Sequence, residues 1–237
     1  MSTSEQKTVL ITGANRGVGL AVAKGFLENK WRVVAGVRDV TKMPQLDGDL
    51  VVVKIDSAST TDALEAVEEL KNKHNITQLD IVLANAGVAS TSGPLYQTDL
   101  EKFDYGHAVN VRGPLALYQA VRPLLKDGAT FVVVSSVAGC ITGDCIPAVG
   151  AYGSTKVALN FLMRHINQEE PKLKVFAIHP GWLDTDMGNA GAKAMGVDAP
   201  SEKLSVAAPA IVQLLLKATK EETSGLMWKF DGTKLPF

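Results

Sequence analysis

The chain has few cysteines, no long apolar run and almost no net charge. Two cysteines, Cys140 and Cys145, are too few in 237 residues for a disulfide framework. No stretch approaches the ~20 consecutive apolar residues that cross a bilayer. With 24 basic and 25 acidic side chains, the formal net charge is −1. That balance gives no electrostatic reason to expect nucleic acid or an anionic membrane as a partner.

Metal ligands and nucleophile motifs are also scarce. The four histidines are scattered along the chain, at His74, His107, His165 and His179. The cysteine pair lacks the further ligands of a structural zinc site, so we expect no metal. There is no Gly-x-Ser-x-Gly motif, which argues against a serine hydrolase. The polar residues 1–7 lack the apolar core of a signal peptide, and we expect a cytoplasmic protein.

What the sequence does contain is a regular alternation of apolar runs and helical-period segments. The expected strands are 8–11, 33–37, 51–55, 79–83, 131–134, 174–178 and 226–228. The expected helices are 18–26, 62–73, 99–125 with a possible break near Asn110, 152–167 and 207–218. Continuous Val/Ile/Leu runs indicate strands covered on both faces. This predicts one α/β domain over residues 1–237, a doubly wound parallel sheet of Rossmann type with about seven strands and helices on both faces.

Residues 186–201, rich in Gly and Ala, contain no clear periodic pattern. They are expected to be irregular, and a connection of this length is typical of a lid or a binding loop. We therefore predict a substrate lid at 186–201. In a doubly wound sheet, ligands bind at the carboxyl ends of the strands.

A glycine-rich turn follows the first expected strand, with the sequence Thr-Gly-Ala-Asn-Arg-Gly-Val-Gly at 12–19. Glycines at Gly13, Gly17 and Gly19 permit a tight turn and let backbone N–H groups approach a pyrophosphate. The spacing is Gly-x-x-x-Gly-x-Gly rather than Gly-x-Gly-x-x-Gly. A ligand-free β–α turn is the alternative, so the motif depends on its context.

The end of the second strand is expected to choose between two dinucleotides. An acid there binds a ribose 2′-hydroxyl, whereas an arginine accommodates a 2′-phosphate. Arg38 is the first polar residue after Val37, and Arg16 offers a second guanidinium. These residues favour NADP (as NADPH). The alternative is that Arg38 and Asp39 are a solvated loop pair, in which case Asp39 serves NAD.

Two further strand ends carry candidate cofactor contacts. Asp56, followed by Ser57, can accept a hydrogen bond from an adenine amino group. Alternatively, Asp56 caps the helix expected near residue 59. The small residues of Asn-Ala-Gly at 85–87 let the chain pass close to a cofactor, although a plain turn explains them as well.

Tyr152 and Lys156 are the candidate acid–base pair. Their i, i+4 spacing places both on one helix face. A free tyrosine has a pKa near 10, and a nearby ammonium lowers it. A tyrosine tuned in this way can donate the proton that a carbonyl oxygen needs when hydride reaches the carbon. The alternative is an ordinary Tyr/Lys pair on a half-exposed helix.

Polar residues elsewhere can complete such a site. Ser135 and Ser136 follow the fifth expected strand, where a hydroxyl can hydrogen-bond a substrate carbonyl, or simply form a turn. The Asn110 amide can hold a water that relays protons to Lys156. Alternatively, Asn110 faces solvent or breaks the helix.

Six motifs in order make the chain resemble the short-chain dehydrogenase/reductase family, of the compact single-domain kind. They are Thr-Gly-x-x-x-Gly-x-Gly at 12–19, Asn-Ala-Gly at 85–87, Asn110, Ser-Ser-x-x-Gly at 135–139, Tyr-x-x-x-Lys at 152–156 and Pro-Gly-x-x-x-Thr at 180–185. The long gap between Ser136 and Tyr152 is similar to that of carbonyl reductases of the Sniffer and C-factor groups. The Gly-Ala-Tyr-Gly and His-Pro-Gly-Trp segments resemble fungal ketoreductases.

The resemblance implies a catalytic tetrad of Asn110, Ser136, Tyr152 and Lys156, with Ser135 as the alternative serine. It also implies that Lys156 binds the nicotinamide ribose and that Thr185 and Leu183 lie near the carboxamide. Together with the strand-end arguments, the expected cofactor-binding residues are Gly13, Asn15, Arg16, Gly17, Val18, Gly19, Arg38, Asp56, Ser57, Asn85, Ala86, Gly87, Tyr152, Lys156, Pro180, Gly181, Leu183 and Thr185. Pairing into a homodimer or homotetramer through the helices at 110–125 and 152–167 is also implied.

The expected substrate is a small molecule, because three loops at 88–96, 140–149 and 182–200 offer mainly apolar side chains. These are Tyr96, Ile141, Ile146, Trp182, Met187 and Met195. They favour an apolar or aromatic carbonyl compound, unless they only seal the core. The sequence thus predicts an NADPH-dependent carbonyl reductase. The alternative is a nucleotide-binding sensor or a non-redox enzyme on the same fold.

Overall fold

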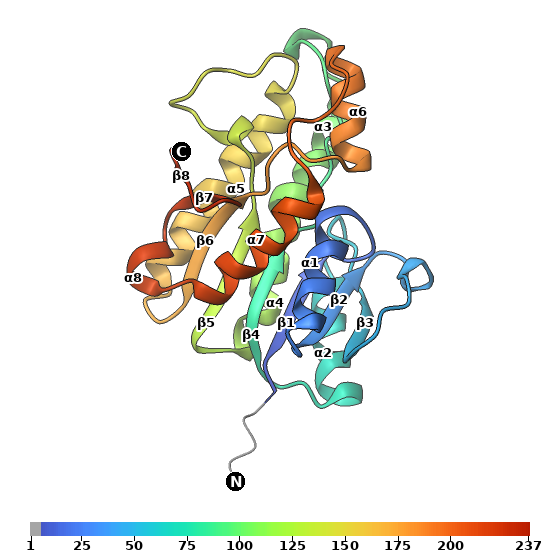
Figure 1. Ribbon diagram of the computed structural model, residues 1–237, viewed down its shortest axis with the longest axis vertical. Coiled ribbons are helices and arrows are strands. Elements are labelled where there is room, and N and C mark those ends of the chain that lie inside the picture. Colours follow the sequence, from blue (N-terminus) through green and yellow to red (C-terminus); the bar gives the residue numbers. More distant parts are fainter. Residues whose placement is uncertain (1–5) are drawn as a thin grey trace.

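The computed structural model describes residues 6–237, so the first five residues, part of the polar start noted above, lie outside the described residues. Its centre is an eight-stranded sheet in the order β3-β2-β1-β4-β5-β6-β7-β8 (Figure 1). The strands are β1 (Thr8–Thr12), β2 (Arg32–Val37), β3 (Leu50–Lys54), β4 (Leu79–Ala84), β5 (Leu125–Val134), β6 (Lys174–His179), β7 (Met227–Lys229) and β8 (Lys234–Leu235). All neighbouring pairs are parallel except β7 with β8. The doubly wound fold is confirmed, with eight strands instead of about seven, because two-residue β8 is too short to leave an apolar pattern.

The helices between the strands are α1 (Gly17–Glu28), α2 (Asp62–His74), α3 (Leu100–His107), α4 (Gly113–Val121), α5 (Gly150–Glu169), α6 (Asp186–Met195), α7 (Leu204–Lys217) and α8 (Lys220–Thr223). A π-helical turn over Ala108–Arg112 joins α3 to α4. The expected break near Asn110 is therefore present, as a widened turn within a continuous helical path. The helical stretch ends at Leu124 rather than Leu125, which is the first residue of β5.

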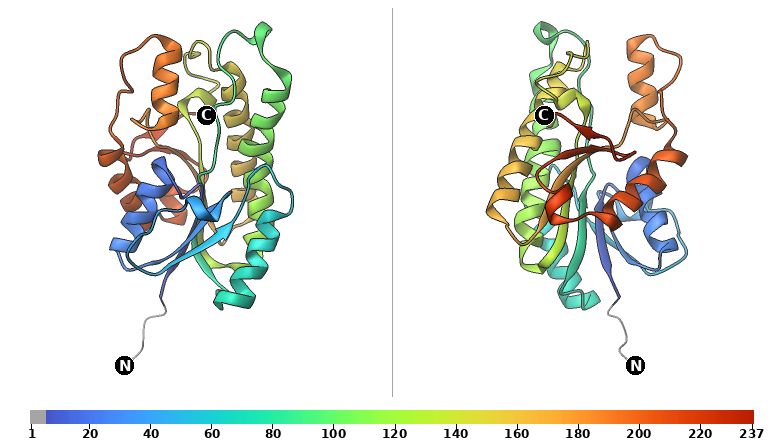
Figure 2. Two further views of the ribbon diagram at one scale, coloured as in Figure 1. Left: turned by 90° about the vertical axis from the view of Figure 1, so that its right-hand side faces the viewer. Right: turned by 60° about the vertical axis from the view of Figure 1, so that its left-hand side comes forward.

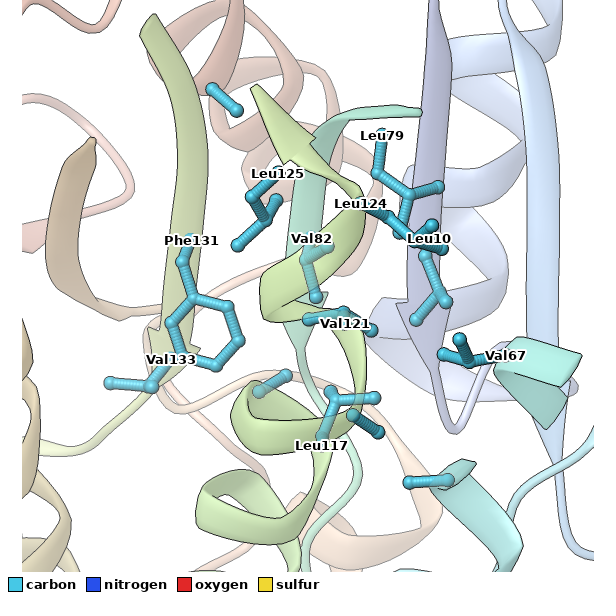
Figure 3. Packing of buried hydrophobic residues seen from close by; sticks show 14 of the residues in the cluster. Leu10, Val67, Leu79, Val82, Leu117, Val121, Leu124, Leu125, Phe131 and Val133 are labelled. Carbon is cyan, nitrogen blue, oxygen red and sulfur yellow. The ribbon is translucent and has the colours of Figure 1, made fainter. Parts of the chain in front are cut away.

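Alternate side chains of each central strand enter two separate apolar cores. Leu10 and Phe131 face α2, α4 and α5, and Figure 3 shows part of that cluster. Val9 and Val132 face α1 and α7 on the opposite side of the sheet. Both faces are thus covered, which is why the strands read as continuous apolar runs. Burying a side chain of this size stabilises the fold by roughly 1.5–3 kcal/mol.

The strand order places the functional end of the molecule. β1 and β4 are neighbours, and the chain continues outward from β1 through β2 and β3 but from β4 through β5 to β8. Their carboxyl ends therefore lie at the point where the winding direction reverses, where open α/β sheets bind ligands. Figures 1 and 2 show α6 and the first turns of α5 standing beyond this end of the sheet.

The expectation that residues 186–201 are irregular is wrong for its first part. Residues 186–195 form α6, capped at the start by Thr185, whose Oγ1 accepts a hydrogen bond from Gly188 N at 3.2 Å. The helix ends at Gly196, which has a left-handed φ of +67°. Residues 196–201 are without regular structure. The low helix propensity of Gly188 and Gly191 hid the helix in the sequence.

Candidate active site

The glycine-rich turn joins β1 to α1 at the reversal point. Gly13 and Gly17 have φ values of +66° and +53°, which L side chains rarely adopt. A Cβ on Gly19 would lie 2.4 Å from Gly13 O, so only glycine lets the helix start this close to the strand. No side chain caps α1, and its first turn carries no acidic residue. Asn15 and Val18 are half-buried in the same turn, whose free backbone N–H groups fit an anionic ligand.

Asn85 braces this turn from the end of β4. Its Nδ2 donates to Thr12 O at 2.7 Å and lies 3.4 Å from Gly13 O. Thr12 Oγ1 accepts from the backbone N–H groups of Asn85 and Ala86 at 3.1 and 3.0 Å. The Asn85 amide group therefore holds the ends of β1 and β4 together, and its N–H groups are directed at the backbone oxygens of Thr12 and Gly13. Thr12 is a positioning residue that the sequence reasoning did not single out.

The end of β2 separates the two candidate charges. Arg38 Nη1 donates to Tyr105 Oη at 3.3 Å, and both side chains are exposed. Asp39 accepts instead from Thr41 N at 3.1 Å and Thr41 Oγ1 at 2.6 Å, capping the short turn at 40–42. These hydrogen bonds, led by the one from the Thr41 side chain, lower the pKa of Asp39. The carboxylate of Asp39 is thus engaged locally, while the guanidinium of Arg38 reaches toward α3.

Arg16, the other predicted phosphate ligand, extends from the glycine-rich turn toward α6. Its Nη1 lies 3.5 Å from Asp186 Oδ2 at the start of that helix. Arg16 pairs with Asp186, whereas Arg38 hydrogen-bonds Tyr105. The two guanidiniums therefore occupy separate positions around the turn.

Asp56 and Ser57 lie after β3. Asp56 Oδ1 accepts from Ala58 N at 2.9 Å, and Asp56 N donates to Asp62 Oδ2 at 3.0 Å. The alternative that Asp56 caps α2 is wrong, because the helix begins at Asp62. Ser57 packs against the start of α4, where a Cβ on Gly113 would lie 2.5 Å from Ser57 O.

Tyr152 and Lys156 project from the first turns of α5. Lys156 is only 4% exposed, and its Nζ donates to Val134 O at 2.8 Å. The same Nζ lies 5.5 Å from the centre of the Tyr152 ring. A Cβ on Gly139 would lie 2.7 Å from Lys156 Cβ, and one on Gly153 would lie 2.5 Å from Ala138 O. These close approaches hold α5 directly against the turn that follows β5.

Burial controls the ionisation of both groups. It lowers the pKa of Lys156 to about 8, because the ammonium loses its hydration. It raises the pKa of Tyr152 to about 12, and interaction with the Ser136 hydroxyl offsets only part of this. The expectation that Lys156 lowers the pKa of Tyr152 is therefore not met in this structure.

The two candidate serines have different surroundings. Ser135 is buried, and its Oγ donates to Asn160 Oδ1 at 2.6 Å, below the site. Ser136 is half-buried at the start of the 137–139 turn, and its Oγ accepts from Ala138 N at 3.2 Å. The Ser136 hydroxyl, unlike that of Ser135, acts to lower the pKa of the Tyr152 phenol. The structure thus brings Ser136, and not Ser135, to the tyrosine.

Asn110 is 1% exposed in the π-helical turn, so the solvent-facing alternative is wrong. Its Nδ2 donates to Val88 O at 2.8 Å and to Thr155 Oγ1 at 3.0 Å, and its Oδ1 accepts from Val88 N at 2.9 Å. The amide is therefore committed to protein atoms, which differs from the expected water-holding role. It ties the loop after β4 to α5, one residue from Lys156.

Gly87 brings these groups together. A Cβ on this residue would lie 3.3 Å from Asn110 Oδ1 and 3.7 Å from Lys156 Nζ. The carboxyl end of β4, the π-helical turn and α5 therefore converge on one point. Asn-Ala-Gly at 85–87 is more than a plain turn, because each residue makes or permits a close contact.

The Pro180–Thr185 segment leaves β6 beside the same turn. Gly181 has φ +93°, and Trp182 N donates to Glu202 Oε2 at 2.6 Å. Leu183 is buried and pairs with Glu202 in an isolated bridge. The Thr185 methyl carbon would lie 3.7 Å from a Cβ on Gly17. Glu202, held in turn by Lys229 at 2.9 Å, closes the base of the 182–203 segment and was missed by the sequence reasoning.

Apolar side chains surround this end of the molecule. Seven of the exposed large hydrophobic residues come from the three loops at 88–96, 140–149 and 182–200 that are predicted to contact the substrate. They are Leu95, Tyr96, Ile141, Ile146, Met187, Met195 and Val197. The first two loops are joined where Gly93 N donates to Ala148 O at 2.9 Å. These residues are exposed, so they do not merely seal the core. Within residues 6–237, no group of three or more His, Cys, Asp or Glu side chains is placed to hold a metal ion.

Comparison with known proteins agrees with this architecture. The short chain dehydrogenase family profile matches residues 7–195, and the chain belongs to this family of oxidoreductases. It is 38% identical to norsolorinic acid ketoreductase nor1 of Dothistroma septosporum, over 99% of this chain and 94% of that one. It is 36% identical to norsolorinic acid ketoreductase of Aspergillus parasiticus, over 98% and 92% of the two chains.

Solved structures show the same fold. Carbonyl reductase Sniffer of D. melanogaster superposes with a TM-score of 0.86 at 22% identity, covering 98% of this chain and all of that one. NADPH-bound carbonyl reductase from chicken fatty liver gives 0.82 at 23% identity, over 99% of this chain and 100% of the other. The fold and the oxidoreductase family are thereby established. Within residues 6–237, no helix is long and apolar enough to cross a membrane.

Proposed function

We propose that this enzyme reduces an apolar or aromatic ketone or aldehyde to an alcohol with NADPH. The observation that carries the proposal is the meeting of Tyr152, Lys156 and Ser136 beside the glycine-rich turn. A dinucleotide site and an acid–base pair at the same strand ends are what hydride transfer to a carbonyl needs.

The proposed reaction assigns one role to each group. The glycine-rich turn, with Arg16 and Arg38, would hold the coenzyme, which would supply a hydride for the carbonyl carbon. Tyr152 donates its phenolic proton to the carbonyl oxygen, and Ser136 hydrogen-bonds that oxygen as charge develops. The phenolate left on Tyr152 recovers its proton from solvent beside the charged Lys156. Asn110 acts as a positioning residue, because its amide fixes α5 against the loop after β4.

The choice of NADPH rests on the charges around the glycine-rich turn. Arg16 and Arg38 are both exposed there, and neither is buried in a structural ion pair. The only acid at the end of β2, Asp39, is engaged with Thr41. A guanidinium suits a 2′-phosphate, and a carboxylate engaged elsewhere is poorly placed for a ribose hydroxyl.

The substrate class rests on the exposed apolar loops around the site. Apolar side chains with flexible methionines, such as Met187 and Met195, favour an apolar or aromatic carbonyl compound. α6 carries one basic side chain, Lys193, so this helix does not favour a highly anionic substrate. The two fungal relatives named above are ketoreductases, which fits a ketone better than an aldehyde.

Several finer points belong to the same proposal. Residues 1–237 form one catalytic domain, and residues 186–201 act as its substrate lid. Free Cys140 and Cys145 fit a reducing cytoplasm. The exposed Phe161 on α5 fits pairing of chains through α4 and α5.

The alternative of a coenzyme sensor without turnover is disfavoured by the grouping of Tyr152 with Lys156.

Two measurements test the proposal. NADPH oxidation is followed against a panel of ketones, quinones and aldehydes, and turnover with apolar members is expected. Tyr152→Phe should lower kcat by at least ~100-fold while NADPH still binds, because the phenolic proton is lost and the ring remains. Tyr118→Phe is the matched control, because the Tyr118 hydroxyl donates to Glu170 at the opposite end of α5 from Tyr152, so this variant should retain kcat. Tight NADPH binding without turnover across the panel would support the sensor instead.

A further inference from the structure

The first residue of α6 is held by the glycine-rich turn. Arg16 Nη1 and Asp186 Oδ2 lie 3.5 Å apart, with side chains 64% and 86% exposed. Next to this pair, the Thr185 methyl group approaches Gly17. The element proposed to bind the coenzyme and the element proposed to cover the substrate therefore touch through one ion pair.

Each member of the pair has only the other as a charged partner within residues 6–237. Asp184, two residues earlier, differs in this respect. It accepts from Leu204 N at 2.6 Å and pairs with Lys203 at 3.4 Å. Asp184 thus belongs to the base of the segment, whereas the charged partner of Asp186 within residues 6–237 is the arginine that is proposed to bind phosphate.

We propose that Asp186 and the 2′-phosphate of the coenzyme compete for Arg16, so that binding of NADPH frees the first turn of α6. The inference rests on the function proposed above. One guanidinium turned toward α6 does not also face a phosphate at the end of β2, and the doubly charged phosphate is the stronger partner. Asp186 therefore reduces the preference for NADPH over NADH that Arg16 and Arg38 create.

The base of the 182–203 segment stays fixed during this exchange. Trp182 N and the Lys229 ammonium both bind the Glu202 carboxylate, at 2.6 and 2.9 Å. Trp182 Nε1 donates to Gly188 O at 3.3 Å, in the first turn of α6. Loss of the Arg16 contact thus leaves the first turn of α6 tied by Trp182 and Thr185 but without its ion pair, so that α6, which carries Met187 and Met195, is held less tightly.

The test uses two ligands that differ only in the phosphate concerned, 2′,5′-ADP and 5′-AMP. Calorimetry on the wild-type protein, Asp186→Asn and Asp184→Asn gives their dissociation constants. Asp186→Asn should tighten 2′,5′-ADP by about two- to fivefold, the range of an exposed ion pair, and leave 5′-AMP unchanged. The gain should shrink at high salt. Asp184→Asn, the matched control, should change neither ligand.

Limited trypsin cleavage after Lys193, which is exposed in α6, gives the second readout. In the wild type, 2′,5′-ADP should speed this cleavage, and in Asp186→Asn the cleavage should be fast with or without it. Equal affinity changes for both ligands, or no change, would overturn the inference while the NADPH assignment stands. If the wild type binds 2′,5′-ADP no more tightly than 5′-AMP, the NADPH assignment and the inference both fail.

Discussion

Lys156 Nζ lies 5.5 Å from the centre of the Tyr152 ring and donates a hydrogen bond to Val134 O. The lysine is buried with one carbonyl as its acceptor, and the loss of hydration lowers its pKa to about 8. Tyr152 keeps its proton until far higher pH, because burial raises its pKa to about 12. Within the working range of an enzyme, it is therefore the lysine and not the tyrosine that titrates.

This relationship predicts the pH dependence of reduction. The Lys156 ammonium is present below a pH of about 8 and is lost above it. Since a positive charge beside the site stabilises the negative charge that develops on the carbonyl oxygen, kcat/KM should be flat at low pH and fall as pH rises through about 8. Initial rates at subsaturating ketone over the pH range give the profile. Lys156→Arg, which keeps its charge, should not show this decline, and a decline with the same midpoint in that variant would exclude Lys156 as its source.

A second prediction concerns coenzyme choice and compares variants of Arg38 and Asp39. Arg38→Glu should weaken NADPH binding at least about tenfold more than NADH binding, because a charge-assisted contact to the 2′-phosphate is replaced by repulsion. Asp39→Asn is the control. Its carboxylate accepts from Thr41, so the ratio of the two affinities should stay within about twofold of the wild type. Dissociation constants from quenching of tryptophan fluorescence measure both ratios. Equal losses for the two coenzymes in Arg38→Glu would remove Arg38 from phosphate binding.

The sequence was sufficient to predict the doubly wound fold, because fully covered strands must be apolar on both faces. It also indicated the carboxyl ends of the strands as the place of the site, since parallel strands end at one edge, and Gly87, Asn110 and Lys156 do lie together there. It could not show how their side chains are used. The amides of Asn85 and Asn110 contact protein atoms, and these partners lie 73 and 22 positions away along the chain. Desolvation of Tyr152 likewise depends on tertiary burial, which no local pattern reports.

The helix α6 was not predicted from the sequence, for a different reason. Its end signals were present in the sequence, with Thr185 before the first turn and Gly196 after the last. Two internal glycines outweighed these signals, although caps of this kind are common at helix ends. Glu202 could not have been found at all, because its role depends on the bridge to Leu183 and the contact with Lys229.

The two glycines of α6 provide a matched pair of variants. A Cβ on Gly188 would lie 1.9 Å from Leu183 O, so Gly188→Ala must displace the first turn of the helix. A Cβ on Gly191 would meet Trp182 Nε1 at an ordinary 3.7 Å, so Gly191→Ala should fit and stabilise the helix by up to about 1 kcal/mol. We expect Gly188→Ala to raise KM for the ketone several-fold and Gly191→Ala to leave it unchanged. Steady-state kinetics at saturating NADPH test this, and equal KM values in the two variants would show that residues 186–195 do not contact the substrate.

His179 predicts how stability depends on pH. This residue lies at the end of β6, 8% exposed, and its Nδ1 has no hydrogen-bond partner. Burial, together with the positive charge of Lys229, lowers its pKa from 6.5 to about 4. The carboxylates of Glu202 and Asp231 act in the opposite direction but do not cancel this shift. Because the folded-state pKa lies below the unfolded one, the unfolded chain takes up the proton first as pH falls. Stability from this residue is therefore complete above pH 6.5 and is lost as pH falls toward 4.

The free energy of unfolding should thus decrease by about 2 kcal/mol between about pH 7 and about pH 5 through His179 alone. Urea titrations at the two pH values measure it. In His179→Gln this part of the decrease should disappear, whereas His165→Gln, which alters an exposed histidine of α5, should keep the wild-type difference. An unchanged pH dependence in His179→Gln would mean that other groups cause the loss. Since His179 directly precedes Pro180 and Gly181, its protonation in the folded protein should also disturb the segment that leads to the proposed lid, and NADPH affinity should fall only as pH approaches 4.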